Sequence, residues 1–270
     1  MTESTDVALT ETDSGATSTE HRRIGESVTT TRPRSVQSAV ATDRATMIAL
    51  TALTFSTGLI DAVSFISFGH VFTANMTGNI VLLGFAVGGA TGLSAARSGA
   101  SLVAFMAGAL FGGMINVRHS GWTQMRLLKR AIVIEAALLL LAASFAASAG
   151  TKNELSPSLT YGLIVLMALA MGVRSAVVRK LAVPDLTTTV LTLTVTGIAS
   201  DSSLAGGANP RWRTRLTAVI TMFAGAATGA MFLRYGVFAP LAASSLLTLA
   251  ALAWMDAMGP EDIQPGSEPA

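Results

Sequence analysis

The sequence predicts an all-α integral membrane protein with about six transmembrane helices, two short re-entrant or broken helices and an inverted internal repeat. Hydrophobic residues make up 51% of the 270 residues and charged residues only 13%. Average proteins carry about 25% charged residues. Arginine and lysine collect at the ends of long apolar runs, where membrane topology explains them. This distribution is typical of a membrane protein and excludes an ordinary soluble domain.

Six apolar segments are long enough to cross a bilayer, which takes about 20 helical residues. These long segments are 45–67, 98–117, 131–149, 157–178, 216–233 and 236–255. Two further segments, 75–90 and 184–200, are too short or too polar to span. Their polar, glycine- or proline-broken entrances favour helices that are interrupted inside the membrane.

Polar tails flank the apolar part of the chain. Residues 1–44 are rich in Ser, Thr and acidic residues and are predicted to be a disordered tail. Since no hydrophobic region precedes residue 46, we expect an uncleaved first helix and no cleavable signal peptide. Residues 257–270 form an acidic C-terminal tail. The chain has no cysteine, so disulfides and thiolate chemistry are excluded.

The membrane part repeats itself, with residues 45–150 as the first repeat and residues 151–256 as the second. Placing Gly58 on Gly172, an offset of 114 residues, aligns GLIDAV with GVRSAV. The same offset places one short, interrupted segment on the other. Each half then reads as long helix, short segment, helix and long helix, which predicts a duplication.

A GxxxG spacing recurs in the third helix of each half. Gly108 and Gly112 match Gly225 and Gly229 at a nearby offset of 117 residues. Small residues at this spacing let two helices approach closely. We therefore interpret these glycines as helix-packing positions without a separate function.

Two long motifs carry a resemblance to a known family. AVSFISFGHVFTANMTGN followed by IVLLG occupies residues 62–84, and VRKLAVPDLTTTVLTLTVTG occupies residues 178–197. Both resemble signatures of the YoaK family of bacterial multi-pass membrane proteins, and the resemblance extends over roughly residues 45–255. It implies a polytopic inner-membrane protein, with transport a frequent suggestion. The resemblance supplies no catalytic residues and no established substrate.

The basic residues favour six spans over eight. If both short segments crossed the membrane, the basic stretch 118–130 would lie opposite the arginine-rich N-terminus, against the positive-inside rule. With six spans, the N-terminus, the stretch 118–130, the region 179–215 and the C-terminus share the cytoplasmic face. Only Arg97, Lys152 and Arg234 then lie outside. Three spans in each half make the two halves antiparallel.

A matched pair of interrupted segments in two inverted halves predicts a transport site where the segments meet, near the membrane midplane. The substrate- or ion-binding candidates are Asp61, Asn75, Thr77, Asn79, Arg174, Thr188 and Thr192. A packing kink or a surface loop is the alternative reading of the two segments. The threonines could line a polar path or equally bond back onto helix carbonyls. A neutral or cationic solute suits Asp61, and Arg174 would reverse that preference if it pointed into the cavity.

Charged residues inside apolar segments need partners or a cavity. We predict a salt bridge between Asp61 and Arg174, with a role in solute or ion coupling, or snorkelling to the interface, as alternatives. Glu135 lies about one turn from Lys129 and Arg130. A salt bridge there, at the membrane boundary, is predicted, with a buried relay as the alternative. His70 lies between segments and is expected at the interface.

The absence of enzyme motifs limits the functions that the sequence predicts. The chain holds no HExxH, GxSxG or phosphate-cradling glycine loop, so we expect no enzyme, cofactor or metal site. Nothing predicts nucleic-acid binding. The leading hypothesis is a small-solute transporter or channel of the cell inner membrane, whose partners are the lipid bilayer and an unknown small solute or ion. The alternative is a non-transporting membrane scaffold or sensor, and a homo-oligomer is compatible with both.

We predict that both termini are cytoplasmic and that the loop near Lys152 lies outside, because of where the basic residues fall. Single cysteines introduced near Arg126 and Lys152 can be labelled in intact cells with an impermeant thiol reagent, since the chain has no native cysteine. Only the cysteine near Lys152 is expected to react. Labelling near Arg126 from outside would exclude the six-span topology.

Overall fold

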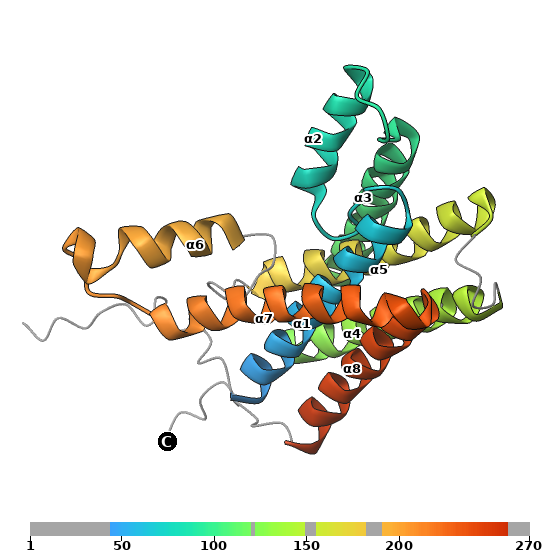
Figure 1. The fold of residues 1–270 in the computed structure, drawn as a ribbon. Coiled ribbons are helices and arrows are strands. Elements are labelled where there is room, and N and C mark those ends of the chain that lie inside the picture. The colour runs from blue at the N-terminus through green and yellow to red at the C-terminus, as the bar shows by residue number, and fades with distance from the viewer. Residues whose placement is uncertain (1–43, 120–121, 149–154, 182–190, 259–270) are drawn as a thin grey trace, which may run out of the picture. The chain divides into compact units, whose positions relative to one another are not determined.

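The computed structural model describes residues 44–119, 122–148, 155–181 and 191–258. Within these ranges the chain is helical and contains no strand. The helices are α1 (Arg44–Ser67), α2 (Met76–Val87), α3 (Ala95–Arg118), α4 (Gln124–Ser148), α5 (Pro157–Leu181), α6 (Leu191–Ser200), α7 (Trp212–Phe232) and α8 (Phe238–Ala257), with two short 3₁₀ turns, η3 (Ser203–Ala205) and η4 (Leu233–Tyr235) (Figure 1).

Six described helices, α1, α3, α4, α5, α7 and α8, are long and apolar enough to cross a membrane. The apolar helices α2 and α6 have only 12 and 10 residues. The predicted all-helical fold with six spanning and two short helices is therefore confirmed. Helix α4 begins at Gln124, earlier than the predicted apolar segment. The reason is that a helix continues past the lipid, where long basic side chains keep their charges in water.

The first helix of each predicted half, α1 or α5, lies in the interior of the bundle. Buried residues make up 67% of the spanning window of α1 and 61% of that of α5, against 28% for α3 and 17% for α7. The largest apolar cluster joins α1, α4, α5 and α8 and includes the completely buried Ile60, Leu139, Ile164 and Leu241. Polar side chains on the inner faces of α1 and α5 are therefore held away from lipid.

Glycines set the closest helix contacts. Helix α3 lies along α5, and a Cβ at Gly108 would collide with the backbone carbonyl of Leu169. Helix α7 lies along α1 in the same way, and a Cβ at Gly225 would collide with the carbonyl of Phe55. Phe55 and Leu169 are themselves 114 residues apart. The two contacts thus occupy equivalent positions in the two halves.

The second glycine of each GxxxG pair continues the same contact one turn later. A Cβ at Gly112 would lie 2.8 Å from the carbonyl oxygen of Val173, and one at Gly229 would lie 2.6 Å from that of Leu59. The other helix pairs correspond as well, since α1 packs on α8 as α5 packs on α4, and α2 packs on α3 as α6 packs on α7. The first helix of each half therefore packs on the third and fourth helices of the other half.

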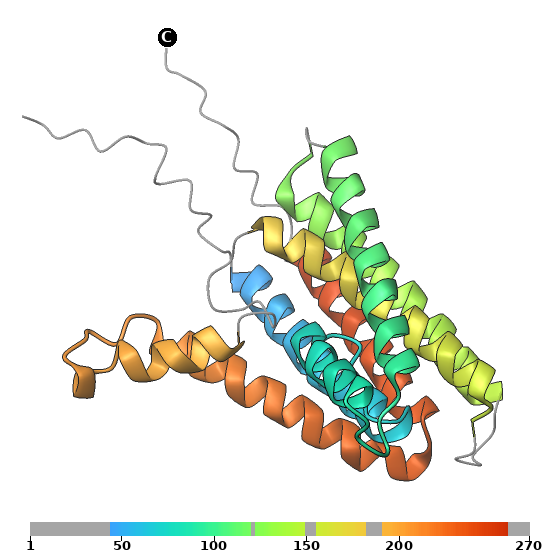
Figure 2. The same cartoon turned by 90° about the horizontal axis from the view of Figure 1, so that it is seen from above.

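The two short helices do not pack against each other. Helix α2 lies along α3 and helix α6 lies along α7 (Figure 1, Figure 2). The prediction that the two interrupted segments meet is therefore wrong for their described parts, α2 and α6, whereas residues 184–190 lie outside the described residues. Each short helix is joined to the next long helix by a brief connection, residues 88–94 or 201–211. Brief connections make consecutive helices antiparallel neighbours, so each short helix folds back on its own successor.

Replacing Gly108 by Ala is expected to destabilise the protein by about 1–3 kcal/mol, because the added methyl group meets backbone atoms that cannot rotate away. Gly113 on the same helix has open space around its Cα. The matched variant Gly113→Ala is expected to change stability by no more than about 0.5 kcal/mol. Thermal unfolding of the two purified variants in detergent checks this, and equal losses would contradict the packing role of Gly108.

Candidate functional site

A buried carboxylate holds the chain between α1 and α2. Asp61 on α1 is only 5% exposed, and its Oδ1 accepts hydrogen bonds from the backbone amides of Thr73 at 3.2 Å and Ala74 at 2.9 Å. Asn75 caps α2 by accepting a hydrogen bond from the backbone amide of Gly78 at 3.2 Å. The negative charge of Asp61 thus lies beside the positive N-terminal end of α2, where it is stabilising.

Asn79 supplies the hydrogen bonds that the extended backbone before α2 lacks. Its Oδ1 accepts the backbone amide hydrogen of Phe72 at 2.8 Å, and its Nδ2 donates to the carbonyl oxygen of the same residue at 2.6 Å. The hydroxyl of Ser101 on α3 also donates to that carbonyl at 2.6 Å. A non-helical backbone at membrane depth is tolerated only when its polar groups are satisfied within the protein. Asn79 is 1% exposed and meets that condition.

The segment between α1 and α2 folds back along α1. Beyond the end of α1, the guanidinium of Arg97 donates to the carbonyl of Phe68 at 3.2 Å. A few residues later the chain lies beside Asp61, six residues before the end of α1, a return of about 9 Å at 1.5 Å per residue. Gly69 (φ 79°) and His70 (φ 60°) make the reversal. This hairpin has the shape of a re-entrant segment.

The structure separates the predicted site residues. Asp61 and Asn79 come together around the start of α2, whereas Thr77 is exposed and Asn75 serves as a cap. Helix α6 lies apart from α2 in both views (Figure 1, Figure 2), and Thr192, which it carries, is exposed. Its backbone carbonyl accepts a hydrogen bond from Thr196 at 2.9 Å, the back-bonding alternative. Of the other two candidates, Arg174 lies on α5, and residue 188 falls outside the described residues.

An ion pair joins α6 to α7. The guanidinium of Arg215 donates to the carbonyl of Gly197 at 2.7 Å and to the carboxylate of Asp201 at 2.6 Å. The hydrogen bond from Arg215 holds the pKa of Asp201 below its usual range. A charged side chain therefore holds each short helix in place. Asp61 on α1 binds the backbone just before α2, and Arg215 on α7 binds the C-terminal end of α6 and Asp201.

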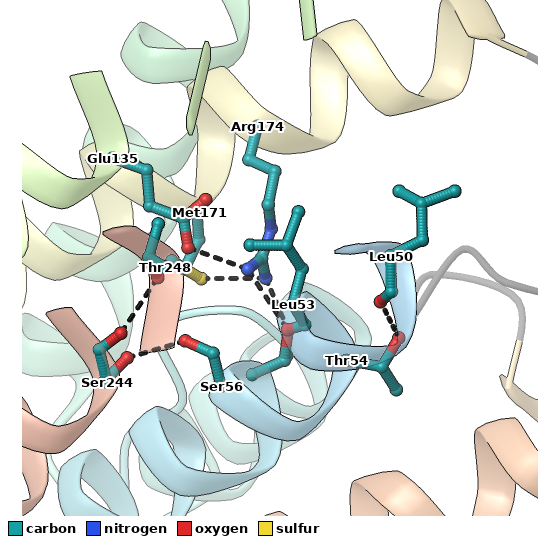
Figure 3. Close-up of polar contacts among 10 residues, drawn as sticks. Leu50, Leu53, Thr54, Ser56, Glu135, Met171, Arg174, Ser244 and Thr248 are labelled. Carbon is teal, nitrogen blue, oxygen red and sulfur yellow. Dashed lines mark hydrogen bonds and ion pairs between the residues drawn. The ribbon is translucent and has the colours of Figure 1, made fainter. Parts of the chain in front are cut away.

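The second candidate site is an ion pair in the centre of the bundle. The Nη1 of Arg174 on α5 donates to Oε1 of Glu135 on α4 at 2.7 Å, and the two side chains are 5% and 0% exposed. Figure 3 shows Arg174 reaching from α5 towards α1, where it also donates to the carbonyl of Leu53 at 3.2 Å. Its Nη2 donates to the hydroxyl of Thr57 and to the sulfur of Met171.

This pairing corrects two predictions. The prediction of a salt bridge between Asp61 and Arg174 is wrong, because Arg174 contacts α1 at Thr57, one helical turn before Asp61. The boundary salt bridge of Glu135 is wrong as well, since Lys129 pairs with Asp256 on α8 at 2.6 Å. Charge spacing along one helix suggested the boundary pair, but the side chain of Glu135 faces inwards and cannot meet that of Lys129.

A signal for the position of Glu135 was present in the sequence. Leu128, Ile132, Glu135 and Leu139 follow one another at spacings of four, three and four residues, and all four side chains are buried. Residues at this spacing share one face of a helix. Reading the apolar stripe of α4, and not only the distance to the nearest base, would have placed this carboxylate inside the bundle.

Hydroxyl groups extend the polar centre from the ion pair to α8. The Oγ atoms of Ser56 on α1 and Ser244 on α8 lie 2.6 Å apart, and Thr248 donates to the carbonyl of Ser244 at 2.9 Å (Figure 3). All three side chains are buried. Side chains from α1, α4, α5 and α8 therefore supply one charge of each sign and several hydroxyls inside the bundle.

One acceptor in this centre is unused. Oε2 of Glu135 is buried and has no hydrogen-bond partner among the described residues. Chemically, such an oxygen can take up a proton or receive a hydrogen bond from a bound molecule. The described part of the chain contains no group of three His, Cys, Asp or Glu side chains that could hold a metal ion.

Removing one member of the ion pair is expected to cost more than removing both. Glu135→Gln alone leaves Arg174 as an unpaired buried cation, for which we expect a loss of about 3–5 kcal/mol in the free energy of unfolding. The double variant with Arg174→Gln is expected to be more stable than either single variant. Chemical denaturation of all four proteins in detergent measures the coupling energy, expected at about 0.5–3 kcal/mol.

The matched control for this cycle is the exposed ion pair of Lys129 and Asp256, whose side chains are 26% and 60% exposed. Exposed pairs contribute about 0–1 kcal/mol, so Lys129→Gln and Asp256→Asn are expected to have small, nearly additive effects. Strictly additive losses at Glu135 and Arg174 as well would contradict a direct interaction between these two side chains.

Comparison with known proteins assigns this arrangement to a family. Residues 49–254 match the family model described as "Protein of unknown function (DUF1275)". The chain is also 32% identical over 160 residues to the UPF0700 transmembrane protein YoaK of Bacillus subtilis (strain 168). These 160 residues make up 59% of this chain and 68% of that protein. No solved structure matches the chain. The predicted resemblance is thereby confirmed: the chain belongs to the DUF1275 family and is a YoaK-like multi-pass membrane protein.

Proposed function

We propose that this protein is a small-solute transporter of the cell inner membrane whose binding site lies at the polar centre around Arg174 and Glu135. The observation that carries the proposal is the burial of this ion pair, with side chains 5% and 0% exposed, among six helices long and apolar enough to span a membrane. A charge at the bilayer centre costs at least about 2.5–3.5 kcal/mol on insertion scales. Charged residues inside the membrane accordingly mark solute and ion pathways.

The matching contacts of the two halves support the proposal. Gly108 on Leu169 and Gly225 on Phe55 are the same contact made twice, and the remaining helix pairs correspond too. We infer a duplicated unit, residues 45–150 and 151–256. Three spans in each unit make the two units inverted with respect to each other. Secondary transporters use inverted repeats because rocking one unit against the other opens a central site to either side in turn.

The proposed topology places both termini in the cytoplasm, since the basic stretch 118–130 and the arginines of the N-terminal region then share one face. In this orientation the α1–α2 hairpin lies towards the outer face and α6 towards the cytoplasm. The two hairpins are then elements at opposite entrances of the pathway. Their separation in the fold is consistent with that role.

A non-transporting scaffold or sensor is the second candidate, and a specific observation favours it. Helices α2 and α6 are each fastened to their own neighbours, by Asp61 and Asn79 in one case and by Arg215 in the other. Fastened hairpins suit a rigid protein as well as a gated one. Whether a solute moves therefore decides between the two functions.

A metabolite comparison tests transport directly. Small solutes inside and outside the cells are measured in a deletion strain, in an overexpressing strain and in a strain that overexpresses the double variant Glu135→Gln with Arg174→Gln. We expect one class of solute to change with overexpression and most of that change to disappear in the double variant. Ser144→Ala, at an exposed hydroxyl on α4, is the matched control and is expected to behave as the unmodified protein.

The double variant lacks both charges, so it avoids the unfolding expected of either single variant, and its amount in the membrane is measured alongside. Identical solute profiles in the deletion and overexpressing strains would overturn the transport proposal. The scaffold or sensor function would then be the better explanation of the fold.

A further inference from the structure

We propose that Glu135 and Arg174 together form a site for one proton and one small monovalent anion, which bind jointly and cross the membrane as a neutral pair. This inference rests on the proposed transport function and names its coupling ion and substrate class. It starts from the unequal use of the two oxygens of Glu135.

The carboxylate of Glu135 can accept a proton without losing its partner. Oε1 accepts the hydrogen bond from Arg174 at 2.7 Å, while Oε2 is buried without a partner among the described residues. A hydronium ion transfers its proton to a lone pair of Oε2: one O–H bond forms on the carboxylate, one O–H bond of the hydronium breaks, and a water molecule is released. The product is a neutral carboxylic acid that still accepts from the guanidinium through Oε1.

Protonation leaves Arg174 without a hydrogen-bonded counter-charge. Because the guanidinium of an arginine side chain carries a positive charge in proteins, the ion pair changes from neutral to one positive charge. An unpaired charge in this environment is strongly unfavourable. A monovalent anion that binds Arg174 restores neutrality. Proton and anion therefore favour each other's binding, and this linkage is reciprocal.

Among the described residues, the other carboxylate whose charge acts on Arg174 is Asp61, and no hydrogen bond joins these two side chains. On α1, the carboxylate of Asp61 is held by the backbone amides before α2. On α8, the sequence has one charged residue, Asp256, which pairs with Lys129. The remaining charged residues of α3, α4 and α5 are all basic and lie near the helix ends, at Arg97, Arg118, Arg126, Lys129, Arg130, Arg179 and Lys180.

The donors around the site favour an anion over a cation. The planar guanidinium of Arg174 matches the two oxygens of a carboxylate or of nitrate. An anion bound there would take over donors that now serve the Leu53 carbonyl, the Thr57 hydroxyl and the Met171 sulfur. The hydroxyls of Ser56 and Ser244 lie in the same polar centre and can donate hydrogen bonds. The preference for a neutral or cationic solute expected from Asp61 is thereby reversed, since its carboxylate is committed to the α2 hairpin.

The proton is tested by infrared difference spectroscopy of the purified protein during acidification. We expect a carboxylic-acid C=O band that is missing from the double variant Glu135→Gln with Arg174→Gln, which lacks this carboxyl group. The variant Asp61→Asn is expected to keep the band and serves as the assignment control. Identical spectra of the unmodified protein and the double variant at every pH where both are folded would overturn the proposal.

The anion is tested by thermal unfolding in the presence of sodium nitrate, sodium lactate or sodium gluconate at equal ionic strength. Glutamine imitates the protonated acid, so Glu135→Gln is expected to unfold at least about 2–4 °C higher in nitrate or lactate than in bulky gluconate. The double variant is expected to show no such difference. A response to nitrate alone indicates an inorganic anion as substrate, and a response to lactate indicates an organic acid.

Each outcome has a defined meaning. If Glu135→Gln does not fold, the same anion comparison is made on the unmodified protein, where acidification is expected to enhance the anion effect. Equal shifts in all three salts, or equal shifts with and without Arg174, would overturn the anion site. A positive result in both tests combined with unchanged cellular solute levels would retain the linked site and reject transport.

Discussion

The interior of a bilayer offers no water to a polar group, and the polar groups of this protein are arranged around that constraint. Arg174 brings a permanent charge into the centre of the bundle, where Glu135, Thr57 and the carbonyl of Leu53 receive its hydrogen bonds. The side chain of Asn79 forms hydrogen bonds with both the backbone amide and the carbonyl of Phe72 in the hairpin before α2. The fold therefore depends on a few long-range polar contacts within an apolar shell.

Close backbone contacts make these polar groups meet. Gly108 against Leu169 and Gly225 against Phe55 bring α3 onto α5 and α7 onto α1. The first helices of both halves become the most buried spans, and the polar side chains on their inner faces are held away from lipid. Because each first helix packs on later helices of the other half, the two halves enclose one shared centre and do not form two separate bundles.

The proposed function joins these features. A neutral ion pair is tolerated inside the membrane, whereas either charge alone is costly. Protonation of this ion pair therefore favours the binding of an anion, and the binding of an anion favours protonation. The unpartnered oxygen of Glu135 is the position at which this exchange would begin. Coupling then follows from charge balance at a single ion pair.

The sequence alone determined the six spans and the two short helices, since bilayer thickness sets a length and a composition that can be read along the chain. It also identified Asp61, Asn79, Arg174 and the spaced glycines as unusual. The tertiary structure decided which residues meet. Arg174 pairs with Glu135, not Asp61, and α2 and α6 lie apart, because contacts between helices depend on the face that each presents, which packing of the whole bundle fixes.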